Sequence, residues 1–399
     1  MTCTITKWTP SEEGTFVLSH IPNDTIYLRL VNLKASSFNV ETFGQIKNVG
    51  LDVEIERSSV QSVTMPSFSN LQRLELDRTY LTDITFEAVN RRLKYLTITN
   101  SRLKNVPGTI VHLAALENLE ISKSPIEAVN LNLFSKLKNL VQLNLCNNQI
   151  LFLHVTEVAT DDFAKLSHLF LAGNHLSSIN SSSFNGMKAL ETLDLQRNLI
   201  KHVHGAPKSN SLKQLDLSKN HIEELYCCDW NLPNLNQLLL GSNELTWIPS
   251  CLPTTMPKLL YLGLASNALK DDDIWQDVVT MEYLTQLDIS SNHLKRAVYQ
   301  SVSLALSMLD LQKNDIEVLS VPIAGKQLRI VASYNLIKSL DIKSLSPNIS
   351  SLDMFCNPLD CSFNRERMWI DEEVVCVEGK KNCVPLQNIT LHIDHSSVP

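Results

Sequence analysis

The sequence is poor in glycine, in basic clusters and in long apolar runs, and each shortage excludes a class of protein. Only 11 of its 399 residues are glycine, which leaves few positions for the loops that hold nucleotide phosphates. Lysine and arginine total 35 against 42 acidic residues, the net charge is −7, and no basic run occurs. Nucleic-acid binding, which needs clustered cations, is therefore not expected. No stretch of about 18 apolar residues is present, so a membrane-spanning helix is not expected either.

Motifs of enzymes and of metal sites are also missing. The sequence has no P-loop, no Gly-x-Ser-x-Gly turn, no His-Glu-x-x-His motif and no Cys-x-x-Cys pair. His202 and His204 have the spacing of two metal ligands, but no third ligand lies nearby, and solvated histidines are the better interpretation. The run Asp271 to Asp273 lacks the alternating ligands of a calcium loop and fits the polar start of a short helix. We therefore expect no enzymatic activity, no cofactor and no metal ion.

What the sequence does contain is a repeat. The pattern Leu-x-x-Leu-x-Leu-x-x-Asn-x-Leu recurs in phase as fifteen units from 33 to 357, a mean period of 324/14, about 23 residues. The asparagine position is held by Asn148, Asn174, Asn198, Asn220, Asn243, Asn267, Asn292, Asn314, Asn335 and Asn357, and in the first five units by Leu33, Ser58, Thr79, Ser101 and Ser124.

This period and pattern are typical of leucine-rich repeats. They predict an α/β fold, a curved solenoid of about 15 repeats with a parallel β-sheet on its concave face. Each Leu-x-Leu core is a short strand with leucines inward and the x residues outward. The asparagine amide can satisfy backbone groups of the turn, so stacked copies form a ladder, and the first five units should be less regular. We assign 1–22 to an N-terminal cap containing Trp8 and Phe16, 23–355 to the solenoid and 356–399 to a C-terminal cap.

Binding is expected at the outward strand positions. In the first repeats these positions are charged, which would attract a basic partner, whereas in later repeats aromatic and small residues prevail. Exposed aromatic side chains suit a protein-binding patch, although solenoid surfaces also scatter such residues without a partner. The predicted concave patch comprises His168, Phe170, Leu239, Tyr261, Met308 and Tyr334.

Nine cysteines raise the question of disulfides. Cys228 and Cys251 each lie eight residues after a ladder asparagine, so they occupy the same position in consecutive repeats. Neighbouring parallel strands are about 4.8 Å apart and a disulfide joins Cα atoms roughly 4.4–6.8 Å apart. A Cys228–Cys251 disulfide is therefore favoured over two buried thiols. Because nine is odd, one thiol is left over, and Cys227 is the first candidate for an interchain bond; a shielded thiol is the alternative.

The segment after Asn357 resembles the cysteine-rich C-terminal cap of extracellular leucine-rich repeat proteins. It departs from that cap at Phe363, where a cysteine is usual, and Cys356 can replace it. Four cysteines allow three connectivities. We favour two bonds, Cys356–Cys376 and Cys361–Cys383.

Four glycosylation sequons accompany these cysteines and favour the secretory pathway. The N-terminus has no signal-peptide pattern, so either a signal peptide has been removed or the protein is cytosolic, and we favour the former. The sequons begin at Asn23, Asn180, Asn348 and Asn388.

The stretches 262–275 and 287–294, the pair Cys227-Cys228 and the atypical cap are similar to the secreted leucine-rich immune proteins of mosquitoes. This resemblance implies a haemolymph protein that pairs with a related chain, in some cases through a disulfide, and stabilises a complement-like thioester protein. Many members carry a coiled coil after the cap, whereas this sequence stops at Pro399 without heptads.

Two main hypotheses follow for function. The first is a secreted innate-immune recognition or adaptor protein that binds a complement-like thioester protein or a related leucine-rich repeat chain. The second is the ectodomain of a cell-surface receptor or adhesion protein. A cytosolic scaffold, a third, would require reduced cysteines.

Overall fold

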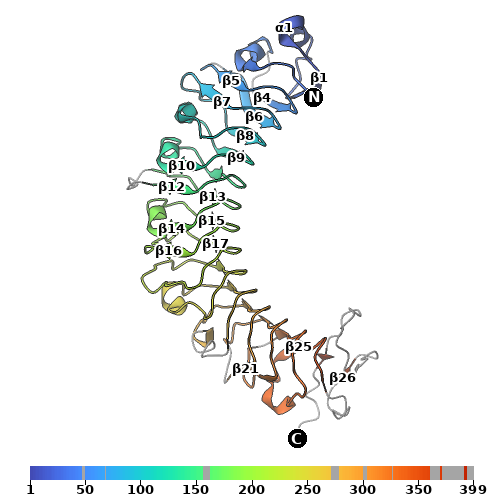
Figure 1. The fold of residues 1–399 in the computed structure, drawn as a ribbon, viewed down its shortest axis with the longest axis vertical. Helices are drawn as coiled ribbons and strands as arrows, with labels where there is room; N and C mark the ends of the chain where they lie inside the picture. The colour runs from blue at the N-terminus through green and yellow to red at the C-terminus, as the bar shows by residue number, and fades with distance from the viewer. Residues whose placement is uncertain are drawn as a thin grey trace. The chain divides into compact units, whose positions relative to one another are not determined.

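The computed structural model describes residues 1–46, 50–67, 69–155, 162–270, 278–299, 303–325, 327–359, 369–370 and 391–392. The chain divides into two compact units, residues 1–199 and 200–399. Figure 1 colours the first from blue to green and the second from yellow-green to red. Each unit is a leucine-rich repeat solenoid with a parallel sheet along one face, which confirms the predicted fold class.

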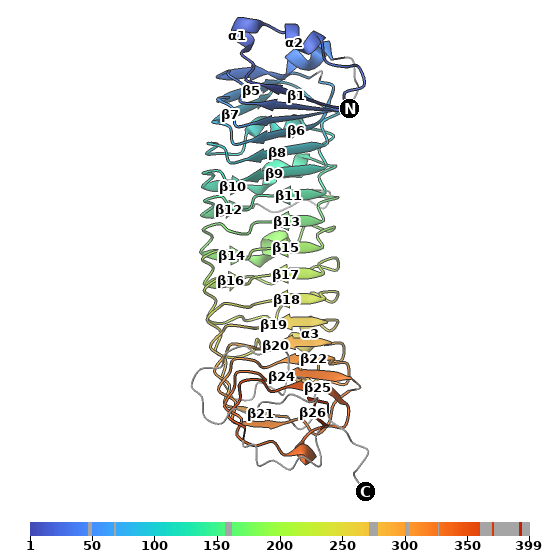
Figure 2. The same ribbon diagram turned by 90° about the vertical axis from the view of Figure 1, so that its right-hand side faces the viewer.

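In the first unit the strands of the main sheet pair in register, each with the equivalent strand of the next repeat. Figure 2 shows them side by side in sequence order. They are β1 (Thr2–Thr6), β2 (Tyr27–Val31), β4 (Leu51–Glu56), β6 (Leu71–Asp77), β8 (Tyr95–Thr99), β9 (Asn118–Ser122), β11 (Gln142–Asn144), β13 (His168–Phe170) and β15 (Thr192–Asp194).

The second unit repeats this arrangement with parallel pairing from strand to strand. Near the C-terminus β26 (Trp369–Ile370) pairs antiparallel with β27 (Leu391–His392). β27 in turn pairs antiparallel with the last strand of the parallel series. The parallel strands are β17 (Gln214–Asp216), β18 (Gln237–Leu239), β19 (Tyr261–Gly263), β20 (Gln286–Asp288), β22 (Met308–Asp310), β24 (Leu328–Val331) and β25 (Ile349–Asp353).

The ladder residues hold consecutive coils together, as Asn174 illustrates. Its Nδ2 donates to the carbonyl of Leu145 in the preceding coil and to that of Leu171 in its own, both at 2.9 Å. Its Oδ1 accepts from the backbone N–H of Ile150 at 3.1 Å. The residue before each ladder position has a positive φ, 54° at Arg197 for example. The buried amide thus satisfies backbone groups that a left-handed turn leaves outside the sheet.

The first repeats differ from the later ones in two ways. Serine hydroxyls form part of the ladder: that of Ser58 accepts from the backbone of Leu33, and Ser101 contacts Ser124 at 2.7 Å. The hydroxyl of Thr79 is buried without a hydrogen-bond partner among the described residues. The main-sheet strands from β1 to β9 are five to seven residues long, whereas those from β11 to β22 have three. The ladder is less regular here, but the strand pairing is longer.

The N-terminal segment contains a strand that the sequence pattern does not show. β1 pairs in register with β2, so the sheet begins inside the segment assigned to a separate cap. Trp8 follows Lys7, which has a φ of 60°, and thus occupies the ladder position, where it is 2% exposed. Its indole Nε1–H donates to the carbonyl of Gly14. Phe16, the other aromatic residue named for the cap, is 72% exposed and contacts only the ring of His20 among aromatic side chains of the described residues.

The return segments contain short elements rather than long helices. Figure 2 places α1 and α2 at the β1 end of the first unit. The helices are α1 (Pro10–Glu13), α2 (Phe16–Ser19) and α3 (Leu252–Thr255), with 3₁₀ turns at Val40–Gln45, Gly108–His112, Leu131–Lys136, Ser181–Phe184 and Ile342–Ser344. Short lateral strands are β3 (Ser37–Asn39), β5 (Ser62–Met65), β7 (Asp83–Phe86), β10 (Ala128–Asn130), β12 (Phe152–His154), β14 (Ser178–Asn180), β16 (His202–His204), β21 (Arg296–Val298) and β23 (Val318–Ser320).

Candidate protein-binding faces

The outward face of the second unit has an apolar centre over β18 and β19. Tyr261 lies flat along its strand: a Cβ built on Gly263 would be 3.2 Å from the tyrosine Cε1 and 3.4 Å from a Leu239 methyl carbon. Glycine therefore leaves the space in which the ring lies. Leu239 and Tyr261 are half-buried rather than exposed. Leu239 and Tyr261 together form a flat apolar surface that is surrounded by small residues.

Two further residues of the predicted patch occupy different environments. Met308 is a half-buried outward residue of β22, in register with Arg329 of β24. Tyr334 lies instead on the left-handed turn after β24, with a φ of 57°, and packs edge-on against Phe355 at 5.7 Å between ring centroids. The predicted patch is thus divided between the outward face of the strands and the turn that follows β24.

Aspartates occupy the middle outward position of several strands of this face. Asp288 Oδ1 accepts from the backbone N–H of Ser290, and Asp353 Oδ1 from that of Phe355, each at 3.0 Å. Asp310 accepts from both the backbone and the side-chain amide of Gln312. Burial raises the pKa of Asp310, and the charges of Asp288 and Asp353 raise it further, while the Gln312 hydrogen bonds oppose this. The aspartates therefore anchor the strand ends and also concentrate negative charge.

Tyr261 responds to the same charges. Its pKa is raised, first by burial and then by Asp288 and Asp310. The apolar centre and the carboxylates thus lie within electrostatic reach of one another on adjoining strands.

In the first unit the predicted patch is smaller. The rings of His168 and Phe170 stack on β13 with centroids 6.1 Å apart, and both side chains are half-buried. Ser167 Oγ lies 2.7 Å from His168 Nδ1. On the neighbouring repeat burial raises the pKa of the Cys146 thiol to about 11. This thiol is therefore a neutral side chain near pH 7 rather than a nucleophile.

The charged repeats of the first unit form a network of ion pairs. Arg29 contacts Glu54 at 3.2 Å and Glu56 at 2.8 Å. On β6 the side chain of Arg73 contacts Asp52 of β4 and Glu75 of its own strand, each at 3.6 Å. These contacts neutralise much of the acidic charge that the sequence places there.

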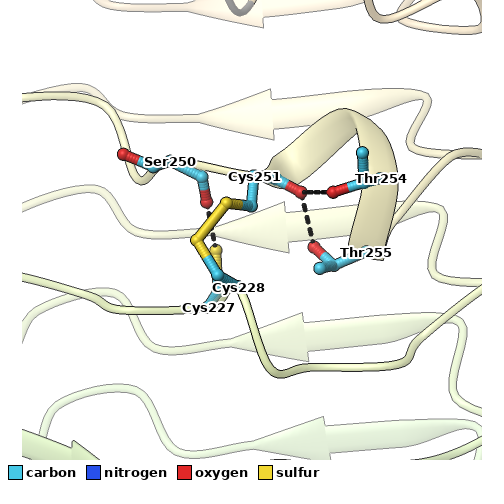
Figure 3. Close-up of a disulfide and its surroundings, with 6 residues drawn as sticks. All are labelled: Cys227, Cys228, Ser250, Cys251, Thr254 and Thr255. Carbon is cyan, nitrogen blue, oxygen red and sulfur yellow. Dashed lines mark hydrogen bonds between the residues drawn. A yellow bond between two sulfur atoms is a disulfide. The ribbon is translucent and has the colours of Figure 1, made fainter.

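The predicted disulfide is present in the second unit. Cys228 and Cys251 are bonded with their Cα atoms 5.0 Å apart (Figure 3). The prediction of an interchain bond from Cys227 is not supported. This side chain is 0% exposed, and its thiol donates to the carbonyl of Ser250. A buried thiol cannot reach a second chain without local unfolding.

Some of the other predicted sites lie within the described residues and some lie outside them. Cys356 is disulfide-bonded, but Cys361, Cys376 and Cys383 lie outside the described residues, so the connectivity of the C-terminal cap stays a prediction. Within the described residues no group of three metal-ligating side chains occurs. His202 and His204 are both exposed, and their rings stack on β16 with centroids 5.9 Å apart. The segment Asp271–Asp273 lies outside the described residues.

The glycosylation sequons differ in their surroundings. Asn23, Asn180 and Asn348 are exposed, whereas Asn388 lies outside the described residues. The Oδ1 of Asn180 accepts from the backbone N–H of Ser182. The Nδ2 of Asn348, the atom that a glycan would modify, donates to the carbonyl of Ala324 at 2.8 Å. Glycosylation stays a prediction at all four sites.

Comparison with known proteins decides the family. Residues 164–222 match the family model described as leucine rich repeat. Lumican of Coturnix japonica is 31% identical over 239 residues, which cover 58% of this chain and 67% of lumican. The chain belongs to the leucine-rich repeat proteins. Osteomodulin of Bos taurus is 27% identical over 286 residues, 65% of each chain, so the match spans about two thirds of these relatives.

Solved structures support the fold alone. The leucine-rich repeat domain of APL1 aligns with a TM-score of 0.58 at 18% identity, covering 82% of this chain and 85% of that domain. The TLR13–ssRNA13 complex aligns with the same TM-score at 19% identity, covering 86% of this chain and 63% of that one. At these identities the leucine-rich repeat architecture is shared, while ligands are not transferable.

Proposed function

We propose that this leucine-rich repeat protein acts outside the cell and binds other proteins through the outward strand faces of its units. The observation that carries the proposal is the face of the second unit, where Tyr261 lies over Gly263 beside Leu239. A flat aromatic side chain with few rotatable bonds, set among small residues, gives contact area at a low entropic cost.

Two further observations support an extracellular setting. The Cys228–Cys251 disulfide is a bond that persists in oxidising compartments. The relatives osteomodulin, lumican and keratocan are extracellular matrix proteins, and lumican, keratocan and fibromodulin are non-enzymatic structural or binding proteins. None of the helices in the described part of the chain has the length and hydropathy for crossing a bilayer.

In its specific form the proposal is an innate-immune adaptor of insect haemolymph. The support is the similarity of residues 262–275 and 287–294 to secreted mosquito leucine-rich immune proteins. The expected partners are a complement-like thioester protein or a related leucine-rich repeat chain.

The test is capture of partners from haemolymph by the tagged, disulfide-bonded protein, with identification by mass spectrometry. Enrichment of a thioester protein or of a second leucine-rich repeat chain is the expected result. A Leu239→Ser, Tyr261→Ser bait should lose the partner. A Tyr283→Ser bait, altered at a tyrosine that is 54% exposed elsewhere in the unit, should retain it. Recovery of no soluble protein, with staining of cell surfaces, would instead favour the receptor or adhesion ectodomain.

A further inference from the structure

The outward faces of both units carry acidic side chains, but the first repeats of the first unit differ from the second unit in how those charges are compensated. In the first unit Glu54 and Glu56 pair with Arg29, and Glu75 pairs with Arg73. These carboxylates therefore already have cationic partners within the fold.

In the second unit the equivalent strand position is occupied by Asp288, Asp310 and Asp353, which we call the acidic column. The register aligns Asp288 with Asp310, Asp310 with Val331, and Val331 with Asp353. Within the described residues none of the three aspartates has an ion pair. Arg329, an outward residue of β24, makes none there either. The column thus holds three carboxylates without an ion-pair partner among the described residues, of which Asp310 is the most buried, at 9% exposure.

The hydrogen bonds of these aspartates do not neutralise their charge. They accept backbone N–H groups two residues further along the strand, which fixes each carboxylate in orientation. A fixed carboxylate loses little conformational entropy when a cationic side chain pairs with it. Tyr261, one strand before Asp288, adds an aromatic face against which a cation can lie.

We propose that this face binds an extended basic segment of a protein partner, whose lysine or arginine side chains pair with the acidic column and contact Tyr261. The proposal rests on the proposed protein-binding function and names the chemistry of the partner. An extended chain presents alternate residues roughly 6.6 Å apart, and strands are about 4.8 Å apart. Basic residues at positions i, i+2 and i+4 therefore span roughly 13 Å, close to the roughly 14 Å from β20 to β25.

The test uses the whole disulfide-bonded protein and a fluorescent nine-residue peptide with lysine at alternate positions and serine between them, in buffer containing EDTA. The matched probe is the same peptide with every lysine acetylated. We expect the lysine peptide to bind at least about tenfold more tightly than the acetylated one. Its affinity should also fall about tenfold between 50 and 300 mM salt, because paired charges are screened. Equal affinity for the two peptides would overturn the proposal.

Variants locate the interaction. Replacing the column by Asp288→Asn, Asp310→Asn and Asp353→Asn keeps an Oδ1 acceptor for each backbone N–H, as Asn144 does at the same position of β11. This triple variant should fold, with an unchanged circular dichroism spectrum, and bind the lysine peptide at least about tenfold more weakly.

A control triple removes the same number of charges from exposed positions off the column in the second unit. It combines Glu282→Gln, Asp315→Asn and Glu317→Gln. The control should bind the lysine peptide within about twofold of the wild type. A loss equal to that of the column triple would show a response to net charge alone and would overturn the proposal.

Partner capture with the wild-type protein and with the column triple as baits separates this inference from the proposed function. If the wild-type protein captures a partner and the column triple captures it equally well, the basic-segment proposal is wrong while protein binding stands. If the column triple loses the lysine peptide while the wild-type bait captures no protein, the basic-binding surface stands and the proposed function fails.

Discussion

At the residue scale, the ladder asparagines use their amides in both directions. Asn292 donates from Nδ2 to the carbonyls of Leu264 and Ile289, and its Oδ1 accepts from the backbone N–H of Leu269, all at 3.0 Å. Its side chain is nearly inaccessible, so water cannot replace it. A single amide thus satisfies backbone groups of its own coil and of the preceding one.

We expect Asn292→Ala to lower the free energy of unfolding by about 1–3 kcal/mol, because buried backbone groups lose their partners. Urea denaturation followed by circular dichroism measures the change. The control is Gln286→Ala at an exposed strand position, which should change stability by less than about 0.5 kcal/mol. Equal stability of the two variants would contradict the role of the ladder.

The pKa of Asp310 gives a second residue-scale prediction. It is raised in the folded protein, so the native state holds this proton more tightly than the unfolded state does. The resulting stabilisation is present below the unfolded pKa and is lost as the pH rises through the folded pKa. Asp310→Asn should therefore gain stability relative to the wild type as the pH rises from about 3 to 7. A stability difference that stays constant over this range would contradict the raised pKa.

A related change separates burial from charge repulsion. Asp288→Asn removes a neighbouring negative charge, so the pKa of Asp310 should fall towards its ordinary value. Carboxyl chemical shifts from NMR titration measure it. An unchanged pKa would mean that the charge of Asp288 does not contribute to the shift.

At the element scale, the Cys228–Cys251 disulfide connects two consecutive return segments over a sequence separation of 23 residues. Replacing both cysteines by alanine should lower the free energy of unfolding by about 3 kcal/mol, since the bond restricts the unfolded chain. Guanidinium denaturation of the whole protein, followed by circular dichroism, measures the loss. Cys146→Ala, at a half-buried cysteine without a disulfide, is the matched control. An equal effect of both changes would contradict a stabilising role for the bond.

The elements that could be predicted from the sequence are those that the period specifies. Ladder spacing alone gave the Cys228–Cys251 pair, because equal positions in consecutive repeats are neighbours in space. The strand at the N-terminus was missed because Trp8 occupies the ladder position, where the pattern expects asparagine. For Cys227 the sequence leaves an interchain bond and a shielded thiol both open, because the pattern does not determine which way a return segment faces.

The surface chemistry was less predictable than the core. Outward positions are unspecified in the repeat, so the pattern identifies Tyr261 as outward but not that Gly263 leaves space for its ring. The hydrogen bonds of Asp288 and Asp310 to the strand ends depend on side-chain orientation, which spacing does not encode. Tyr334 is an exception, because it directly precedes the ladder residue Asn335 and the spacing therefore already places it on the left-handed turn and not on the face.

At the scale of the whole molecule, the chain has a net charge of −7 and the sheet faces of its two units carry acidic side chains. In the first repeats Glu54, Glu56 and Glu75 are paired with arginine, whereas the acidic column of the second unit has no ion pair among the described residues. Long-range attraction of a basic partner therefore favours the second unit. The account as a whole predicts that partner binding depends on access to this face.

The most direct test places a glycan on that face. Gln237→Asn with Leu239→Thr creates a sequon on β18, and Asp315→Asn with Glu317→Thr creates one off the main sheet, just before the lateral strand β23. Intact mass confirms occupancy, and both baits and the wild type are then compared for partner capture from extracellular fluid. The account predicts loss of the partner with the β18 glycan and full capture with the other. Undiminished capture by the β18-glycosylated protein would contradict it.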